Sequence, residues 1–305
     1  MFELFRKETK MLKETMNCKR NISVSAMVLV TLLILLCTEI VSALVMIFVL
    51  ALQGVESNSL DIILSNPTDS SQILQLFMTA IPIIGFLFAS KHLFKRSRDS
   101  LGLTKEHLLR DYLKGLGIGF VMMSSVVLIA YFMNGLRFEG FNNFSIIVIF
   151  AYFIGFMVQG FNEELMLRGF FMNAIAARKT TVYAVLLNSI LFALLHLLND
   201  GISVIAFINL ILAGVTFSLM ALYHDNIIVC SAAHSIWNFA QGNLFGVLVS
   251  GIFFPTSVAR FASVENLAFI NGGNFGLEGG IAVSIVEIVT IGIYCYLYKR
   301  KNNHN

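Results

Sequence analysis

Residues 144–177 read FSIIVIFAYFIGFMVQGFNEELMLRGFFMNAIAA, an apolar stretch long enough to cross a lipid bilayer. Inside it, Glu163, Glu164 and Arg168 lie where hydrocarbon would surround them. Ionised groups at that depth cost several kcal/mol each unless they are paired or solvated. The stretch therefore predicts a membrane helix whose charges are either tightly paired or functional.

The chain as a whole is strongly apolar. Of its 305 residues 57% are hydrophobic and 13% are charged, and its mean hydropathy is +0.80. Soluble domains carry about 25% charged residues. We therefore expect an all-α, polytopic membrane protein, a bundle of about eight transmembrane helices. The apolar runs of spanning length lie at about 23–53, 72–94, 114–135, 144–177, 181–199, 202–223, 227–250 and 280–298.

Positive charge indicates how this bundle lies in the membrane, because Lys and Arg are retained on the cytoplasmic side. Eighteen of the 21 Lys and Arg residues fall in the first 21 positions, in 91–114, at the turn 178–179 or in 299–305. The loops of the opposite side hold only Arg137 and Arg260. We expect a multi-pass protein of the cell membrane with both termini cytoplasmic.

The same distribution divides the chain into three parts. Residues 1–22 are predicted to be a basic cytoplasmic leader, 23–298 a transmembrane domain and 299–305 a basic cytoplasmic tail. Segment 99–113 indicates either a short amphipathic helix on the inner membrane face or a solvated connector. Segment 251–279, rich in Gly and Asn, indicates an outer loop. The four cysteines show no C-x-x-C spacing and indicate neither a disulfide frame nor a zinc knot.

Helix geometry separates the two adjacent glutamates. Neighbouring residues on an α-helix lie about 100° apart, so Glu163 and Glu164 face different directions. Glu164 lies one turn before Arg168, the favourable order for an ion pair. Glu163 has no such partner on its own helix, which makes it a functional candidate. Glu39 and Glu287, isolated in other apolar runs, are predicted to form interhelical hydrogen bonds.

Two later helices supply further polar groups. His196 follows Phe192 by one turn in FALLH, and His234 precedes Asn238 by one turn in HSIWN. Counting residues from the nearest loops places His196 and Glu163 at similar depth and His234 closer to the cytoplasmic side.

Together, one glutamate, two histidines and one asparagine on three helices are able to hydrolyse a peptide bond with water. The reaction needs a base, donors for the oxyanion and an acid for the leaving amine. Glu163 suits the base, and His196 can hold the water or relay its proton. His234 and Asn238 can donate hydrogen bonds to the oxyanion.

A metal centre is the alternative arrangement. Glu163, His196 and His234 would form a three-ligand set with one open position, as catalytic zinc prefers. The H-E-x-x-H helix of many zinc proteases is absent, as is the G-x-S-x-G turn of one type of serine hydrolase. The sequence leaves a zinc-dependent and a metal-free mechanism open.

Three segments resemble the motifs of the CPBP family, also called Abi or CAAX-protease-like. They match E-E-x-x-x-R, F-x-x-x-H and H-x-x-x-N on successive apolar helices, in the form EELMLR (Glu163, Glu164, Arg168), FALLH (Phe192, His196) and HSIWN (His234, Asn238). The resemblance covers a catalytic core at about 100–250. The stretch GGNFGLEGG is also similar to bacterial members.

The resemblance implies an eight-helix intramembrane protease, in a family that carries a metalloprotease label. It implies that Glu163 and His196 activate water and that His234 and Asn238 form the oxyanion site. In this scheme Glu164, Arg168 and Phe192 give structural support. Eukaryotic relatives cleave a prenylated C-terminal tail, whereas peptide or bacteriocin maturation, or self-immunity, is the setting that we expect for a bacterial member.

We therefore expect an intramembrane endopeptidase, a hydrolase acting on peptide bonds. Its predicted partners are the membrane lipid bilayer and a membrane-associated peptide or protein substrate. The net charge of +3 gives no indication of a nucleic-acid partner. Two alternatives stay open: a non-catalytic membrane scaffold or regulator on the same helical fold, and a transporter with Glu39, Glu163 and Glu287 as a proton path.

Overall fold

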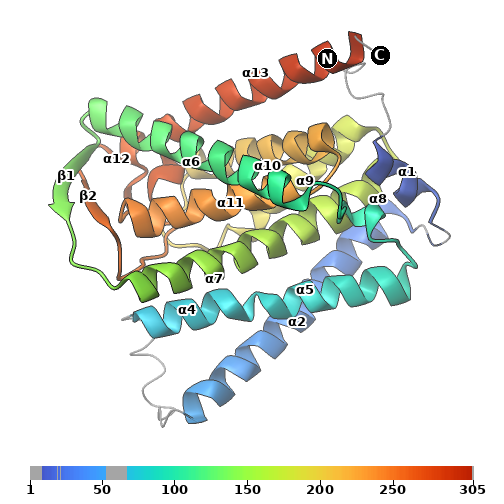
Figure 1. Ribbon diagram of the computed structural model, residues 1–305, viewed down its shortest axis with the longest axis horizontal. Coiled ribbons are helices and arrows are strands. Elements are labelled where there is room, and N and C mark those ends of the chain that lie inside the picture. The colour runs from blue at the N-terminus through green and yellow to red at the C-terminus, as the bar shows by residue number, and fades with distance from the viewer. Residues whose placement is uncertain (1–8, 19, 21, 53–66, 304–305) are drawn as a thin grey trace.

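The computed structural model describes residues 9–18, 20, 22–52 and 67–303, and most of these are helical (Figure 1). The all-α expectation is confirmed. Parts of the predicted leader and tail, residues 1–8, 19, 21 and 304–305, lie outside the described residues. The helices are α1 (Lys10–Met16), α2 (Val24–Leu52), α4 (Asp69–Met78), α5 (Ala80–Phe88), α6 (Leu108–Phe132), α7 (Ile146–Glu164), α8 (Asn173–Ala176), α9 (Thr181–Leu195), α10 (Val204–His224), α11 (Ile228–Phe239), α12 (Ala268–Asn271) and α13 (Ile281–Asn303).

Three π-helical segments continue the longer helices. Ala89–Leu93 follows α5, Leu165–Met172 follows α7 and Ala240–Leu244 follows α11. A π-helical turn widens the helix and is frequent at functional sites. The segment after α7 begins directly behind the two adjacent glutamates.

Within the described residues, six helices are long and apolar enough to cross a membrane. The six are Val24–Leu52, Asp69–Leu93, Leu108–Phe132, Ile146–Ala176, Val204–His224 and Ile281–Lys301. The other two predicted spans, 181–199 and 227–250, are present as the shorter helices α9, of 15 residues, and α11, of 12 residues before its π-helical continuation. The polytopic membrane fold is therefore confirmed, with six rather than eight helices of full spanning length in that part of the chain.

α11 lies at the centre of the bundle, between α6 and α7. All of its residues are buried. Small residues let the neighbouring helices approach it closely. A Cβ on Gly119 of α6 would lie 2.2 Å from the carbonyl oxygen of Ala233, and one on Gly160 of α7 would lie 2.8 Å from the backbone nitrogen of Ser235. The side chains of α11 are thus held between two close neighbours.

α2 is the span least covered by the rest of the protein. Only 6% of its most apolar window is buried, and in Figure 1 it runs obliquely to α4 and α5, on which it packs. Its uncovered surface carries large apolar side chains, which would face lipid in a bilayer. They include Leu29, Leu33, Leu36, Ile40 and Leu44.

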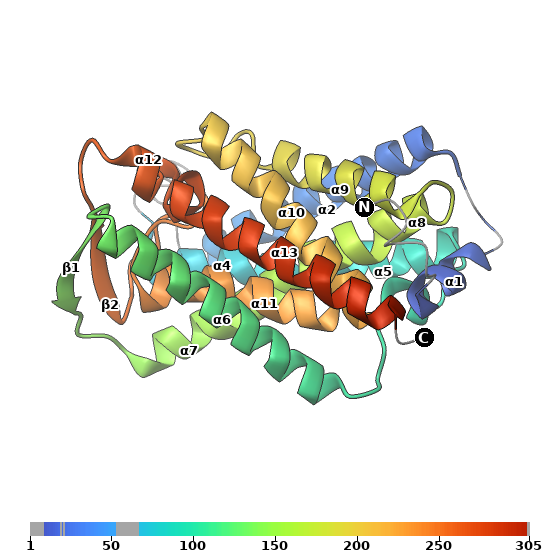
Figure 2. The same cartoon turned by 90° about the horizontal axis from the view of Figure 1, so that it is seen from above.

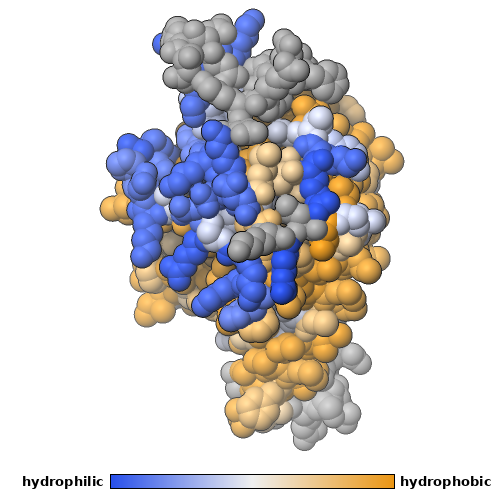
Figure 3. Space-filling model, turned by 90° about the vertical axis from the view of Figure 1, so that its right-hand side faces the viewer, coloured by the Kyte–Doolittle hydropathy of each residue, from blue (hydrophilic) through white to orange (hydrophobic). Residues whose placement is uncertain are grey.

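One end of the bundle is hydrophilic. At this end the backbone N–H groups of Lys10 and Met11 donate to the Asp225 carboxylate, and Lys301 Nζ donates to the Tyr223 carbonyl. The start of α1 and the end of α13 therefore lie together (Figure 2). Figure 3 looks onto this end and shows hydrophilic residues gathered there, beside a hydrophobic flank.

The connectors differ in part from the sequence-based expectation. Segment 99–113 is a connector for most of its length: a 3₁₀ turn at Asp99–Leu101 and irregular chain lead to α6, which begins at Leu108. Segment 251–279 contains a strand, β2 (Ala259–Ser263), that pairs antiparallel with β1 (Leu136–Phe141). The sequence did not predict this two-stranded ribbon, because its strands are more than 100 residues apart.

Candidate functional site

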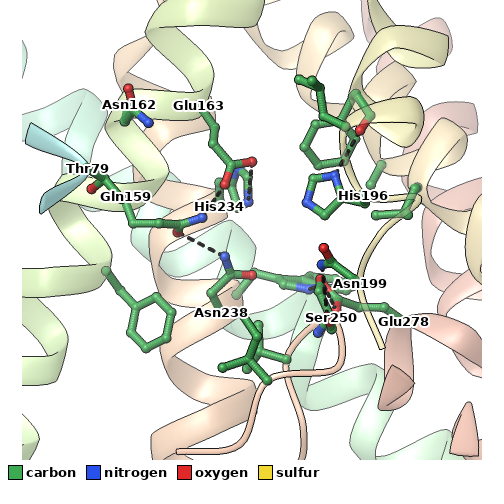
Figure 4. Close-up of a pocket in the computed structure, with 18 of the residues that line it drawn as sticks. Thr79, Gln159, Asn162, Glu163, His196, Asn199, His234, Asn238, Ser250 and Glu278 are labelled. Atoms are coloured by element: carbon green, nitrogen blue, oxygen red, sulfur yellow. Dashed lines mark hydrogen bonds and ion pairs between the residues drawn. The ribbon is translucent and has the colours of Figure 1, made fainter. Parts of the chain in front are cut away.

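A cavity of about 290 Å³ opens in the middle of the bundle. Its walls come from α2, α4, α7, α9, α10 and α11, and from the chain around residues 249–254 and 278. The structure brings all four predicted site residues to this one cavity: Glu163, His196, His234 and Asn238. Figure 4 shows Glu163 and His234 on one side of it, with His196 facing them.

Glu163 has a partner on its own helix, contrary to the sequence-based expectation. Gln159, one turn earlier on α7, donates from Nε2 to Oε1 of Glu163. The side-chain oxygen of Gln159, Oε1, in turn accepts a hydrogen bond from Asn238 Nδ2 at 3.0 Å. Gln159 therefore links the glutamate of α7 to the asparagine of α11 and fixes the direction of both side chains. The second carboxylate oxygen of Glu163 faces His234.

Glu164 is fully buried and joins two helices. Its Oε1 accepts from Arg168 Nη1 at 2.8 Å and lies 2.9 Å from His234 Nδ1. The predicted ion pair of Glu164 with Arg168 is present. The Arg168 guanidinium also lies 5.1 Å from the Phe192 ring centroid and donates from Nη2 to the Gly214 carbonyl at 3.0 Å.

These contacts determine the orientation of the His234 ring. A carboxylate only accepts hydrogen bonds when ionised, so the nitrogen that faces Glu164, Nδ1, is the one that carries a proton. His234 Nε2 is then the nitrogen directed to the cavity, 3.9 Å from Oε2 of Glu163. The ring of Phe217 stacks on the imidazole with centroids 4.8 Å apart and an interplanar angle of 12°.

His196 lies at the end of α9 and not within the helix as predicted. It is the residue that caps the helix, and its Nδ1 lies 2.8 Å from the carbonyl oxygen of Phe192. The last carbonyls of a helix have no partner further along the helix, and here the ring satisfies one of them. A carbonyl oxygen only accepts, so Nδ1 carries the proton and Nε2 of the neutral ring is a free acceptor.

In the structure His234 lies at the same depth as Glu163. Counting residues from the loops had instead predicted a position closer to the cytoplasmic side. That count assumed that Arg178, in the turn that follows the fourth apolar run, and Asn226, before α11, lie at the same level. A Cβ on Gly169 would lie 3.6 Å from Ile227 Cδ1, so these two residues lie side by side. Glu163 is six residues from Gly169, and His234 is seven from Ile227. The chain beyond Gly169 extends past the start of α11, which made Glu163 look deeper than His234.

Sequence analysis missed several polar residues of the cavity. Glu278 accepts from the backbone N–H and the hydroxyl of Ser250, at 2.6 and 2.7 Å, and from Trp237 Nε1 at 3.4 Å. Asn199 Nδ2 donates to the Ser250 carbonyl at 2.9 Å. The glycine-rich stretch that contains Glu278 gave the only sequence signal, and it was interpreted as an outer loop. Part of that loop instead folds back into the bundle.

The two isolated glutamates differ from one another. Glu287 on α13 accepts a hydrogen bond from the Thr216 hydroxyl on α10, as expected of an interhelical contact. Glu39 on α2 lines the cavity. Among the described residues, Glu39 has no hydrogen-bond or ion-pair partner.

The proposed zinc ligands do not form a metal centre in this arrangement. No three His, Cys, Asp or Glu side chains of the described residues gather closely enough to hold an ion. Zinc is held by donors at about 2.0–2.3 Å from the ion. His234 Nε2 and Glu163 Oε2, 3.9 Å apart, are close enough for two such donors, but no further side chain of these types among the described residues completes a group of three.

Comparison with known proteins supports the interpretation of the three motifs. Residues 142–240 match a family model described as type II CAAX prenyl endopeptidase Rce1-like. No curated protein matches the chain. The matched segment runs from the start of α7 to the end of α11 and includes Glu163, His196, His234 and Asn238. Residues 142–240 are therefore a domain of the CPBP/CAAX intramembrane protease family, the family that the sequence motifs resemble.

Proposed function

We propose that this protein is an intramembrane endopeptidase that hydrolyses a membrane-associated peptide or protein with water activated by Glu163. One observation carries the proposal: the Glu163 carboxylate lies in a cavity within the bundle, oriented by Gln159, with His234 and His196 on the same walls. The family match supports peptidase activity in general terms.

In the proposed mechanism Glu163 acts as base and then as acid. Its carboxylate takes a proton from water while the water oxygen attacks the carbonyl carbon of the substrate. The same proton passes from Glu163 to the amine when the C–N bond breaks. His196 Nε2, an acceptor in the neutral ring, holds the second hydrogen of the attacking water and orients its lone pair.

Asn238 and His234 would stabilise the oxyanion. Asn238 uses one amide hydrogen on Gln159 and keeps the other for the substrate. His234 donates from Nε2 only as an imidazolium, and the Glu164 carboxylate at Nδ1 stabilises that cation. Each such donor contributes roughly 10²–10³ in rate.

The substitution Glu163→Gln tests this function. We expect a folded protein whose turnover of membrane-anchored, fluorescence-quenched peptides in lipid vesicles falls by about 10²–10⁴, the usual contribution of a general base. Glu265→Gln, at an exposed glutamate beyond the cavity, is the control and should cleave as the wild type does. Equal rates for wild type and Glu163→Gln would exclude the mechanism. A scaffold would lose folding or partner binding instead.

We also propose that the end of the bundle formed by α1 and the end of α13 is cytoplasmic. The support is the hydrophilic surface of this end (Figure 3) and the Lys and Arg residues that the sequence has in 10–20 and 299–301. Lys179 at the α8–α9 turn and Glu265 near β2 are both exposed and lie on opposite sides in this arrangement. This orientation can be tested by cysteine labelling, with a single cysteine introduced at either position into a protein that lacks its native cysteines. A reagent that cannot cross the membrane should label Glu265→Cys in intact cells, and Lys179→Cys only after lysis.

A further inference from the structure

The cavity has an acidic lining that contains no Lys or Arg side chain of the described residues. The charged side chains among the described residues that line it are Glu39, Glu163 and Glu278, and none of these lining residues is Lys or Arg. His196 has a neutral form with its proton on Nδ1, and the His234 imidazolium of the proposed mechanism faces the Glu164 and Glu163 carboxylates rather than Glu39. Arg168, the nearest guanidinium, is fully buried behind Glu164 and is compensated by it.

Of the three carboxylates, Glu39 is the one left for a ligand. Glu163 is held by Gln159, and Glu278 accepts hydrogen bonds from Ser250 and Trp237. Glu39 is exposed, has no hydrogen bond or ion pair with any described residue, and lines the same cavity as Glu163. A cationic group of a ligand would give the Glu39 carboxylate the partner that it lacks among these residues.

The position of Glu39 indicates what the cation belongs to. Glu39 is 15 residues from Val24 and 13 from Leu52, the ends of α2. At about 1.5 Å per residue it lies roughly 20 Å from either end of the helix, near the middle of the span. Lipid headgroups do not reach that depth. A side chain of a peptide that enters the cavity does.

We propose that Glu39 is a specificity-determining residue that receives a cationic side chain, lysine or arginine, of the substrate peptide near the bond that is cleaved. This inference rests on the proposed peptidase function. It also separates this chain from enzymes that receive a free C-terminal carboxylate, because such a group would add a fourth negative charge to the cavity. The substrate is then an internal peptide segment with a basic residue, and Glu39 on the weakly covered α2 meets it at the edge of the bundle.

Binding can be measured without turnover, because Trp237 is the only tryptophan and lines the cavity. The probes are lipid-anchored peptides with acetylated N-termini and amidated C-termini that carry a quencher of tryptophan fluorescence. They differ at one position, which holds lysine, its uncharged analogue norleucine or glutamate. The full-length protein in lipid vesicles should bind the lysine peptide at least about tenfold more tightly than the norleucine peptide, as a charge-assisted hydrogen bond predicts.

Substitutions at Glu39 then test whether this residue causes the preference for the lysine peptide. Glu39→Gln should bind the lysine and norleucine peptides equally, and Glu39→Lys should prefer the glutamate peptide. Leu36→Gln is the matched control, because it introduces the same amide on α2 at an exposed residue outside the cavity, and it should keep the wild-type preference. Equal binding of the two peptides by the wild type, or a lysine preference that survives Glu39→Gln, would overturn the inference.

Cleavage of the same peptides distinguishes the two proposals. If the protein binds the lysine peptide preferentially through Glu39 but cleaves none of the peptides, the peptidase function is contradicted and the cation site at Glu39 is supported. Cleavage that is abolished by Glu163→Gln but is indifferent to the lysine position would support the peptidase function and contradict the role of Glu39.

Discussion

His234 donates a hydrogen bond from Nδ1 to Oε1 of Glu164 at 2.9 Å, and this contact joins α11 to α7 at the centre of the bundle. Because Glu164 also pairs with Arg168, it has a structural role, and its neighbour Glu163 is the carboxylate directed to the cavity. Two identical and adjacent side chains thus have different surroundings. The same substitution at each should therefore have different consequences.

Glu164→Gln should destabilise the protein, whereas Glu163→Gln should not. An amide at position 164 leaves the Arg168 guanidinium uncompensated at 0% exposure. Removing one partner of a buried pair costs about 3–5 kcal/mol of unfolding free energy. Thermal denaturation of the purified variants in detergent measures the difference. Adding Arg168→Met to Glu164→Gln should recover part of the loss, because the unpaired charge is removed. Equal melting temperatures for the two single variants would contradict this division of roles.

The helical bundle and the four main cavity residues could be predicted because local pattern determines them. Apolar runs of spanning length specify the helices, and one-turn spacing places Glu164 beside Arg168 and His234 on the same face as Asn238. The partner of Glu163 was also within reach of the sequence, since Gln159 precedes it by one turn. It was missed because only charged partners were considered.

Other features depend on tertiary structure and leave no local signal. Glu278 reaches the cavity because its loop folds back to Ser250, more than 25 residues earlier. The pairing of β1 with β2 is likewise non-local. The depth of His234 could not be obtained by counting, since α7 and its π-helical continuation extend past the start of α11. Such offsets are determined by how the helices pack, which one-dimensional periodicity does not contain.

Metal chelators should leave peptide cleavage unchanged. The donors proposed from the sequence do not gather into a three-ligand group among the described residues. Turnover of the quenched peptides should therefore be the same, within about twofold, before and after incubation with EDTA or 1,10-phenanthroline, because a zinc-dependent site would lose its activated water. A zinc peptidase treated in parallel shows that the chelators act. Loss of activity that added zinc restores would show that the cavity rearranges around a metal.

Gly119→Ala should destabilise the bundle and Gly117→Ala should not, although both change a glycine of α6 to alanine. A Cβ at position 119 would lie 2.2 Å from the Ala233 carbonyl oxygen, whereas one at position 117 has no atom within 4 Å. Overpacking of this kind costs roughly 1–3 kcal/mol of unfolding free energy. Gly117→Ala should be neutral or slightly stabilising, because alanine is the better helix former.

Thermal denaturation in detergent compares the stability of the two variants, and peptide turnover reports the effect on the site. His234 follows Ala233 directly, so a shift of α11 away from α6 also moves its imidazole relative to Glu163. A displacement of about 1 Å can cost roughly 10²-fold in rate. Gly119→Ala should therefore lose both stability and turnover. Equal melting temperatures for the two alanine variants would contradict the close packing of α6 against α11. The position of His234 would then not depend on that packing.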